Sequence, residues 1–211
     1  MLTAIIDYSS GNLHSARKAF EKISALNNLG SVVVTSNPDV ISSADRLVLP
    51  GDGAFPACKT ELLSSEAYDA MVYAAVEKGR PFLGICVGMQ LMATKGYEYE
   101  ETDGLGWIDG EVCKINLTEK NLKIPHMGWN TLNIENDHPI LKGILNGDHV
   151  YFVHSFQMVV SNRKQRLAYT DYGTDITAVV GNGNLLGLQF HPEKSAKIGL
   201  KMIENFLSWS P

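Results

Sequence analysis

The sequence of 211 residues has few cysteines, no excess of positive charge and no long apolar run. Its three cysteines, Cys58, Cys86 and Cys113, are odd in number and widely spaced. They fit neither a disulfide framework nor a zinc site, so we expect a reducing, cytoplasmic compartment. The net charge of −5 argues against nucleic-acid binding, which needs a basic surface. No apolar run approaches the roughly 18 residues of a membrane span, and the first residues lack a basic leader. We therefore expect no membrane attachment.

The first half of the chain alternates short apolar runs with helical patterns. The runs predict strands and the spacing of apolar residues predicts helices. Strands are expected at 2–6, 31–35, 46–49 and 82–85, and helices at 12–26 and 66–78. Strands and helices that alternate in this way indicate a parallel sheet covered on both faces.

From about residue 106 the pattern changes to short strands separated by turn residues. They are expected at 108–115, 129–134, 150–156, 166–172, 176–180 and 185–190. The sequence GNGN at 181–184 predicts a hairpin turn, and a helix is expected at 196–209. We predict that these strands add antiparallel pairs to the same sheet, within one α/β domain spanning residues 1–211.

The segment 82–91 reads FLGICVGMQL and carries the clearest chemical signal. An apolar strand runs into a G-x-C-x-G turn and then into a helical pattern, which resembles a nucleophile elbow with cysteine in place of serine. The turn is so tight that side chains at positions 84 and 88 would clash. It places Cys86 at the carboxyl edge of the sheet, where α/β proteins hold their sites. Cys86 is therefore the candidate nucleophile, and the alternative is a packing thiol, as we expect for Cys58 and Cys113.

A cysteine nucleophile in acyl transfer needs a general base and a group that orients this base. Of the six histidines, only His191 stands in a His-Pro-Glu unit directly after a predicted strand. Glu193 is placed to accept the second imidazole N–H. The sequence predicts a Cys86–His191–Glu193 triad; the alternative for His191 is a strand-end histidine bonded to backbone.

The segments 84–90 (GICVGMQ) and 187–194 (GLQFHPEK) together resemble the class I glutamine amidotransferase family. Four more blocks narrow the resemblance to the branch that supplies ammonia for imidazole glycerol phosphate synthesis in histidine biosynthesis, at 7–13, 49–55, 124–130 and 151–156. The resemblance spans nearly the whole chain and implies a flavodoxin-like fold with no metal or organic cofactor. It implies glutamine hydrolysis through a γ-glutamyl thioester. The ammonia would pass to a (β/α)8-barrel cyclase in a heterodimer, which makes imidazole glycerol phosphate and aminoimidazole carboxamide ribotide.

The resemblance also assigns roles around the triad. It implies oxyanion donors at the backbone N–H groups of Val87 and Asp52. It implies glutamine-binding residues at Gly53, Gln90, Glu98, His154 and Ser155, and a docking face for the cyclase at Tyr8, Asn12, Pro125, His126, Trp129, Tyr151 and Lys194. Position 52 departs from the family, which commonly has valine there. Because a carboxylate aimed at an oxyanion opposes catalysis, we expect the Asp52 carboxylate to point to solvent and only its N–H to face the site.

Three alternatives share much of this pattern. The chain could serve a different synthase, in a surface-sugar, anthranilate, aminodeoxychorismate or pyridoxal phosphate pathway, with the same site and another docking face. A stand-alone γ-glutamyl cysteine hydrolase would need no partner and would accept substituted amides. A non-enzymatic paralogue would act as a binding module, and a glutamine-directed alkylator would not label its Cys86.

Overall fold

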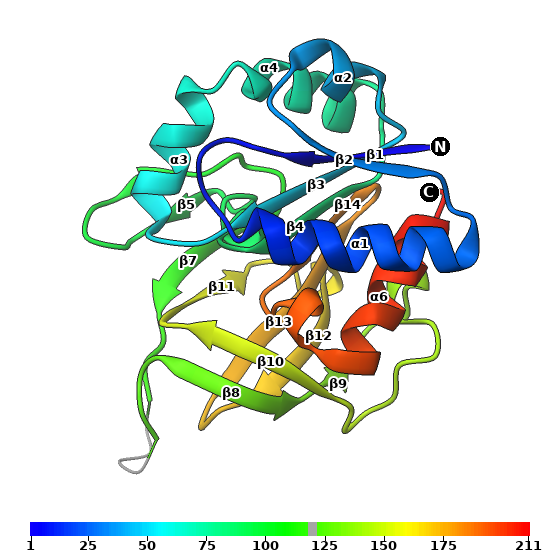
Figure 1. Ribbon diagram of the computed structural model, residues 1–211. Helices are drawn as coiled ribbons and strands as arrows, with labels where there is room; N and C mark the ends of the chain where they lie inside the picture. Colours follow the sequence, from blue (N-terminus) through cyan, green and yellow to red (C-terminus); the bar gives the residue numbers. More distant parts are fainter. Residues whose placement is uncertain (118–121) are drawn as a thin grey trace.

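The computed structural model describes residues 1–117 and 122–211, and an eight-stranded sheet runs through its centre (Figure 1). Five neighbouring strands pair in parallel, and three more continue the sheet with antiparallel pairing. In spatial order they are β2 (Ser31–Thr35), β1 (Leu2–Ile6), β3 (Arg46–Gly51), β4 (Phe82–Cys86), β14 (Leu185–Leu188), β13 (Asp175–Asn182), β12 (Arg166–Asp171) and β9 (Asn133–Ile134). Every residue of β3, β4 and β14 is buried, as expected for parallel strands covered on both faces. The predicted fold class is confirmed.

Helices cover the parallel part of the sheet, because parallel strands need a crossover connection. They are α1 (Leu13–Asn27), α2 (Pro38–Ser43), α3 (Phe55–Ser64), α4 (Ala67–Val72), α5 (Val87–Gln90) and α6 (Ala196–Ser208). Figure 1 shows α1 and α6 in front of the sheet and α2, α3 and α4 grouped at the top of the view. Phe20 of α1 meets Phe206 of α6 edge to face, with ring centroids 6.4 Å apart. No helix among residues 1–117 and 122–211 is long and apolar enough to cross a membrane.

Several strands of the second half lie outside the main sheet, which corrects the prediction that they all join it. One small sheet pairs β8 (His126–Thr131) with β10 (His149–His154). The other joins β11 (Phe156–Val160), β7 (Gly110–Lys114), β5 (Lys95–Gly96) and β6 (Thr102–Asp103). The strand predicted at 150–156 is in fact divided at Ser155, because the segments on either side pair in different sheets.

Other local predictions differ in detail. The hairpin at 181–184 is confirmed: Asn182 pairs with Leu185, and Gly183 adopts a φ of 58°, which glycine tolerates. The helix predicted at 66–78 is α4 followed by the π-helical turn η1 (Tyr73–Glu77). Neither α2 nor α3 was predicted. Short 3-10 turns occur at η2 (Pro139–Leu141), η3 (Arg163–Gln165) and η4 (Pro192–Lys194), and η4 follows β14 at the edge where β3 and β4 also end.

Candidate active site

The turn between β4 and α5 has the geometry of a nucleophile elbow. Cys86 adopts φ 55° and ψ −113°, a conformation that is costly for a residue with a side chain. A Cβ atom on Gly84 would lie 2.5 Å from the carbonyl oxygen of Gly88, and one on Gly88 would collide with the Leu49 carbonyl. Glycine at both positions therefore lets the turn close against β3, and the cysteine is held at the end of its strand.

His191 joins Cys86 to Glu193. Its Nδ1 lies 2.8 Å from Glu193 Oε1, and the exposed fractions of the two side chains are 6% and 3%. Burial lowers the pKa of His191. However, side-chain hydrogen bonds with Cys86 and Glu193, and the negative charges of both, raise it to about 9. The imidazole thus stays protonated at neutral pH between a sulfur and a carboxylate.

Ser195 fixes the turn that carries His191 and Glu193. Its Oγ donates to the carbonyl oxygen of His191 over 2.6 Å and accepts the backbone N–H of Tyr151 over 2.9 Å. The His191 backbone N–H donates to the Tyr151 carbonyl over 3.0 Å. The general-base candidate is therefore bonded directly to the backbone of β10.

A cavity of about 230 Å³ opens beside Cys86. Its lining includes the predicted oxyanion and glutamine-binding positions together with four other residues: Asp52, Gly53, Cys86, Val87, Gln90, Glu98, Pro125, Val153, His154, Ser155 and Phe156. The structure thus gathers segments from five separate parts of the chain around one sulfur. Among the described residues, no group of three or more His, Cys, Asp and Glu side chains is placed to hold a metal ion.

Comparisons with known proteins agree with this geometry. Residues 4–209 match the model of the family described as "Glutamine amidotransferase class-I". The chain belongs to the class I glutamine amidotransferase family. It is 64% identical to a protein of Ruegeria pomeroyi and 54% identical to one of Cereibacter sphaeroides, both named "Imidazole glycerol phosphate synthase subunit HisH" and both matched over 100% of each chain.

Solved structures support the amidotransferase fold at low sequence identity. One described as "Crystal structure of glutamine amidotransferase" superposes with a TM-score of 0.71 at 18% identity, covering 97% of this chain and 96% of the other. A putative GMP synthase protein of Thermoplasma acidophilum superposes with a TM-score of 0.68 at 19% identity, covering 98% of this chain and 92% of the other. These superpositions support the fold, and the family resemblance found in the sequence is confirmed by the family model and the two relatives above.

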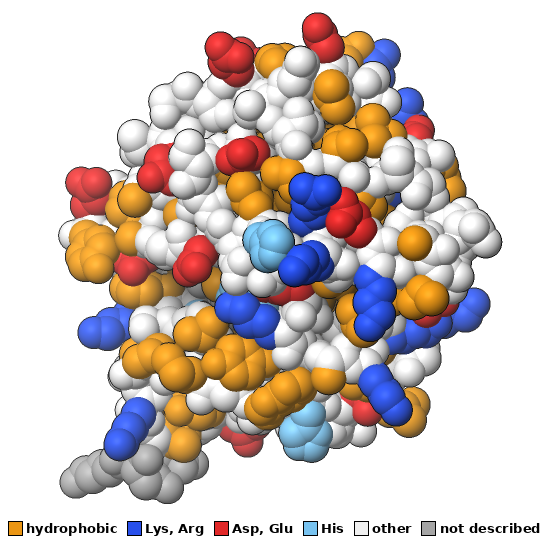
Figure 2. Space-filling model, viewed as in Figure 1, with side chains coloured by type: hydrophobic (Ala, Val, Ile, Leu, Met, Phe, Trp, Pro, Cys, Tyr) orange, Lys and Arg blue, Asp and Glu red, His pale blue; other side chains and the backbone are white. Residues whose placement is uncertain are grey.

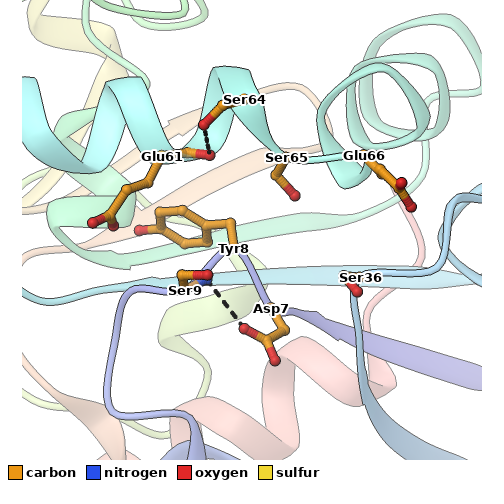
Figure 3. A pocket seen from close by; sticks show the side chains of 8 residues that line it. All are labelled: Asp7, Tyr8, Ser9, Ser36, Glu61, Ser64, Ser65 and Glu66. Carbon is orange, nitrogen blue, oxygen red and sulfur yellow. Dashed lines mark hydrogen bonds between the residues drawn. The ribbon is translucent and has the colours of Figure 1, made fainter.

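A larger cavity of this amidotransferase lies elsewhere, at the carboxyl ends of β1 and β2 (Figure 3). It measures about 340 Å³ and is lined by serines, carboxylates and Tyr8. Figure 3 shows the Ser9 backbone turned toward the Asp7 carboxylate, whose Oδ1 accepts the Ser9 N–H over 3.2 Å. The lining contains no cysteine or histidine, so it lacks the cysteine–histidine pair that lies beside the cavity at Cys86.

The loop before α3 presents one peptide whose orientation is fixed. The carbonyl oxygen of Asp52 accepts Ser10 Oγ over 2.8 Å and Cys58 Sγ over 3.6 Å. Because a trans peptide points its N–H away from its carbonyl, the Gly53 N–H is directed away from Ser10 and Cys58. Asp52 is exposed, and none of the hydrogen bonds found among the described residues joins its carboxylate to Cys86. The second oxyanion donor thus has two candidates, the N–H groups of Asp52 and Gly53.

Three predicted glutamine-binding side chains already have protein partners. Glu98 Oε2 accepts the Phe55 N–H over 2.8 Å, which satisfies the first turn of α3. Gln90 Nε2 donates to the Phe156 carbonyl over 3.0 Å. His154 Nδ1 lies 2.8 Å from the same carbonyl. Because a carbonyl only accepts, this Nδ1 carries the proton.

His154 is further engaged by His126, whose Nδ1 lies 3.0 Å from His154 Nε2. Burial and the charge of His191 lower the pKa of His154 to about 4, so the ring is neutral and this Nε2 accepts. Both nitrogens of His154 are then occupied. Its side chain therefore has no free N–H for a substrate carboxylate. The approach of His154 and Ser155 to that carboxylate stays a prediction, and it would use their backbone N–H groups.

The predicted docking residues differ in accessibility. Tyr8 and His126 are 2% exposed, so their side chains lie inside the protein, and any part they take in docking would be through the residues that cover them. Asn12 is half-buried and its side chain caps α1 by accepting the Ser15 N–H. The others are exposed or half-buried: Pro125, Trp129, Tyr151 and Lys194.

Sequence reasoning missed two residues that contact the triad. Ser195 and Gln189 are both 0% exposed. The sequence did hold a signal for Gln189, because it is the polar residue in the apolar run directly before His191. A buried amide needs hydrogen-bond partners, so a glutamine inside an apolar strand predicts polar neighbours close to His191.

Proposed function

We propose that this chain hydrolyses glutamine to glutamate and ammonia with Cys86 as nucleophile, His191 as general acid and base, and Glu193 as the group that orients His191. The observation that carries the proposal is the buried imidazole bonded on one side to a cysteine at a strained elbow and on the other to a carboxylate. This arrangement supports acyl transfer by a thiolate. The names of the relatives support a role in delivering ammonia to a synthase.

The chemistry follows from the protonation of His191. The Cys86 thiolate attacks the side-chain carbonyl carbon of glutamine, and the oxyanion is held by the N–H groups of Val87 and of the Asp52–Gly53 loop. The carbon–nitrogen bond breaks, and the His191 proton leaves with the ammonia. Neutral His191 then takes a proton from water, whose oxygen attacks the γ-glutamyl thioester. The carbon–sulfur bond breaks, and glutamate leaves while the thiolate–imidazolium pair is restored.

We propose a (β/α)8-barrel cyclase as the partner that receives the ammonia and makes imidazole glycerol phosphate and aminoimidazole carboxamide ribotide. An apolar surface supports a docking site on β8 and β10: Met127 and Trp129 are 61% and 53% exposed, and Trp129 packs against Tyr151. Figure 2 shows hydrophobic side chains gathered over these strands. Exposed apolar side chains that gather in this way are typical of protein–protein interaction sites.

We also propose that residues 1–211 act as one glutaminase domain, supported by a single cluster of buried residues that runs from Ala4 to Trp209. We propose a cytoplasmic location because the three cysteines are free, and free thiols are typical of a reducing compartment.

The test is glutamate release by the chain alone, with the cyclase, and with the cyclase plus its nucleotide ligand. We expect slow turnover alone and faster turnover in the full mixture. Equal turnover in all three would favour the stand-alone hydrolase, and stimulation only by another synthase would favour a different pathway. No turnover in any mixture would contradict glutaminase activity.

A further inference from the structure

Gln189 has no role in the chemistry described so far, although it contacts both Cys86 and Gln90, which line the substrate cavity. It is 0% exposed and follows β14, two residues before His191. Its side-chain Oε1 accepts Gln90 Nε2 over 3.0 Å, and its Nε2 lies 3.9 Å from Cys86 Sγ. The amide therefore connects the helix after the elbow to the sulfur itself.

The orientation of this amide follows from its neighbours. The Phe156 carbonyl can only accept, so the Gln90 atom that faces it must be the NH2 group. The same NH2 group faces Gln189, so Gln189 must present its oxygen there. The NH2 group of Gln189 is then left on the side of Cys86. A flipped amide would put two donors against each other at Gln90 and an oxygen against the sulfur.

The Phe156 carbonyl that starts this sequence of bonds is itself held in place. It accepts both Gln90 Nε2 and His154 Nδ1, over 3.0 and 2.8 Å. Among the described residues, Cys86 Sγ is the acceptor found for Gln189 Nε2. A buried amide without an acceptor is costly, so this contact gives the buried glutamine a specific partner rather than a packing role.

We propose that Gln189 is a further catalytic residue, which donates a side-chain N–H to Cys86 Sγ and stabilises the thiolate. This inference rests on the proposed function, because it assumes that the sulfur is the nucleophile. Gln189 forms and breaks no covalent bond. Its donor stabilises the negative sulfur before attack on glutamine and again when the thiolate leaves the γ-glutamyl thioester, since hydrogen bonds to charged groups are stronger than those to neutral ones.

The test compares the pH dependence of Cys86 alkylation by iodoacetamide in the wild-type chain and in Gln189→Met, which keeps the length of the side chain and removes the donor. In Gln189→Met we expect the pH at which alkylation reaches half its maximal rate to rise by about one unit. Below that pH, alkylation of the variant should be about tenfold slower than that of the wild-type chain. The maximal glutaminase rate in the presence of the cyclase and its nucleotide ligand should also fall about tenfold, with little change in KM. Gln165→Met is the matched control, because it removes one distant hydrogen bond, from the Asp109 N–H.

The titratable groups around Cys86 are unchanged by the substitution. They are His191 with Glu193, Cys58 on α3, and Asp52, Glu98 and His154 at the cavity. A shift seen in Gln189→Met and absent in Gln165→Met therefore reports the lost amide. An unchanged alkylation profile in folded Gln189→Met would overturn the inference.

A measurement on the wild-type chain covers the case in which Gln189→Met does not fold. In isotopically labelled protein, the side-chain amide resonances of Gln189 should move when iodoacetamide alkylates Cys86, because the sulfur loses its charge. Unmoved resonances would contradict the inference. If the wild-type chain with cyclase released no glutamate, the proposed function would fail instead, whatever the behaviour of Gln189.

Discussion

Replacement of Glu193 by glutamine tests how the carboxylate acts on His191. The wild-type pKa of His191 is raised to about 9, so the imidazolium persists up to that pH and is lost as the pH rises through it. We expect glutaminase activity to fall above about pH 9, because the leaving ammonia then lacks its proton donor. Glu193→Gln keeps an oxygen near Nδ1 and removes the charge from a contact of 2.8 Å.

The magnitude follows from the strength of that contact. A buried hydrogen bond to a charged group contributes about 1.5–3 kcal/mol, which corresponds to about one to two pH units. The alkaline limit, which is the pH above which glutamate release falls, should therefore move down from about 9 by about one to two units. The maximal rate should fall roughly 10- to 100-fold. The assay is glutamate release against pH with cyclase and nucleotide present. Glu204→Gln, which removes a surface ion pair with Lys201, is the control. An alkaline limit that stays in place in Glu193→Gln would refute this account of His191.

Two further substitutions test the surroundings of the triad. Ser10→Ala removes the 2.8 Å hydrogen bond to the Asp52 carbonyl, which stabilises the orientation of the loop by about 1 kcal/mol. The kcat should therefore fall about fivefold with KM nearly constant, and an unchanged kcat would count against an ordered loop. Trp129→Ala removes an exposed aromatic side chain of the proposed docking face. Titration calorimetry should show that the variant binds the cyclase at least about tenfold more weakly than the wild-type chain does, whereas wild-type affinity would exclude Trp129 from that face.

The closeness of Cys86, His191 and Glu193 could be anticipated because the motifs that carry them are local. The G-x-C-x-G turn and the His-Pro-Glu unit each follow a strand, and the parallel pairing of β4 and β14 brings the two strand ends together. Glycine at positions 84 and 88 is required by the close approach of neighbouring backbone, which sequence reasoning can anticipate.

The division into three sheets could not be predicted in the same way. Apolar alternation identifies a strand but does not say which sheet it joins, so the break at Ser155 was missed. Accessibility is equally non-local: Tyr8 and His126 stand in motifs of the docking branch, yet both are buried by distant segments. The contact of Gln189 with Cys86 spans 103 positions and depends on packing that no single segment contains.

The central claim is that Cys86, and neither of the other two thiols, attacks the γ-carbonyl of glutamine. The most direct measurement is peptide mapping by mass spectrometry after incubation with 6-diazo-5-oxo-L-norleucine, a reactive glutamine analogue, in the presence of cyclase and nucleotide. We predict one adduct per chain, on Cys86, and no adduct in Cys86→Ala. An adduct on Cys58 or Cys113, or an unlabelled wild-type chain that still hydrolyses glutamine, would contradict it.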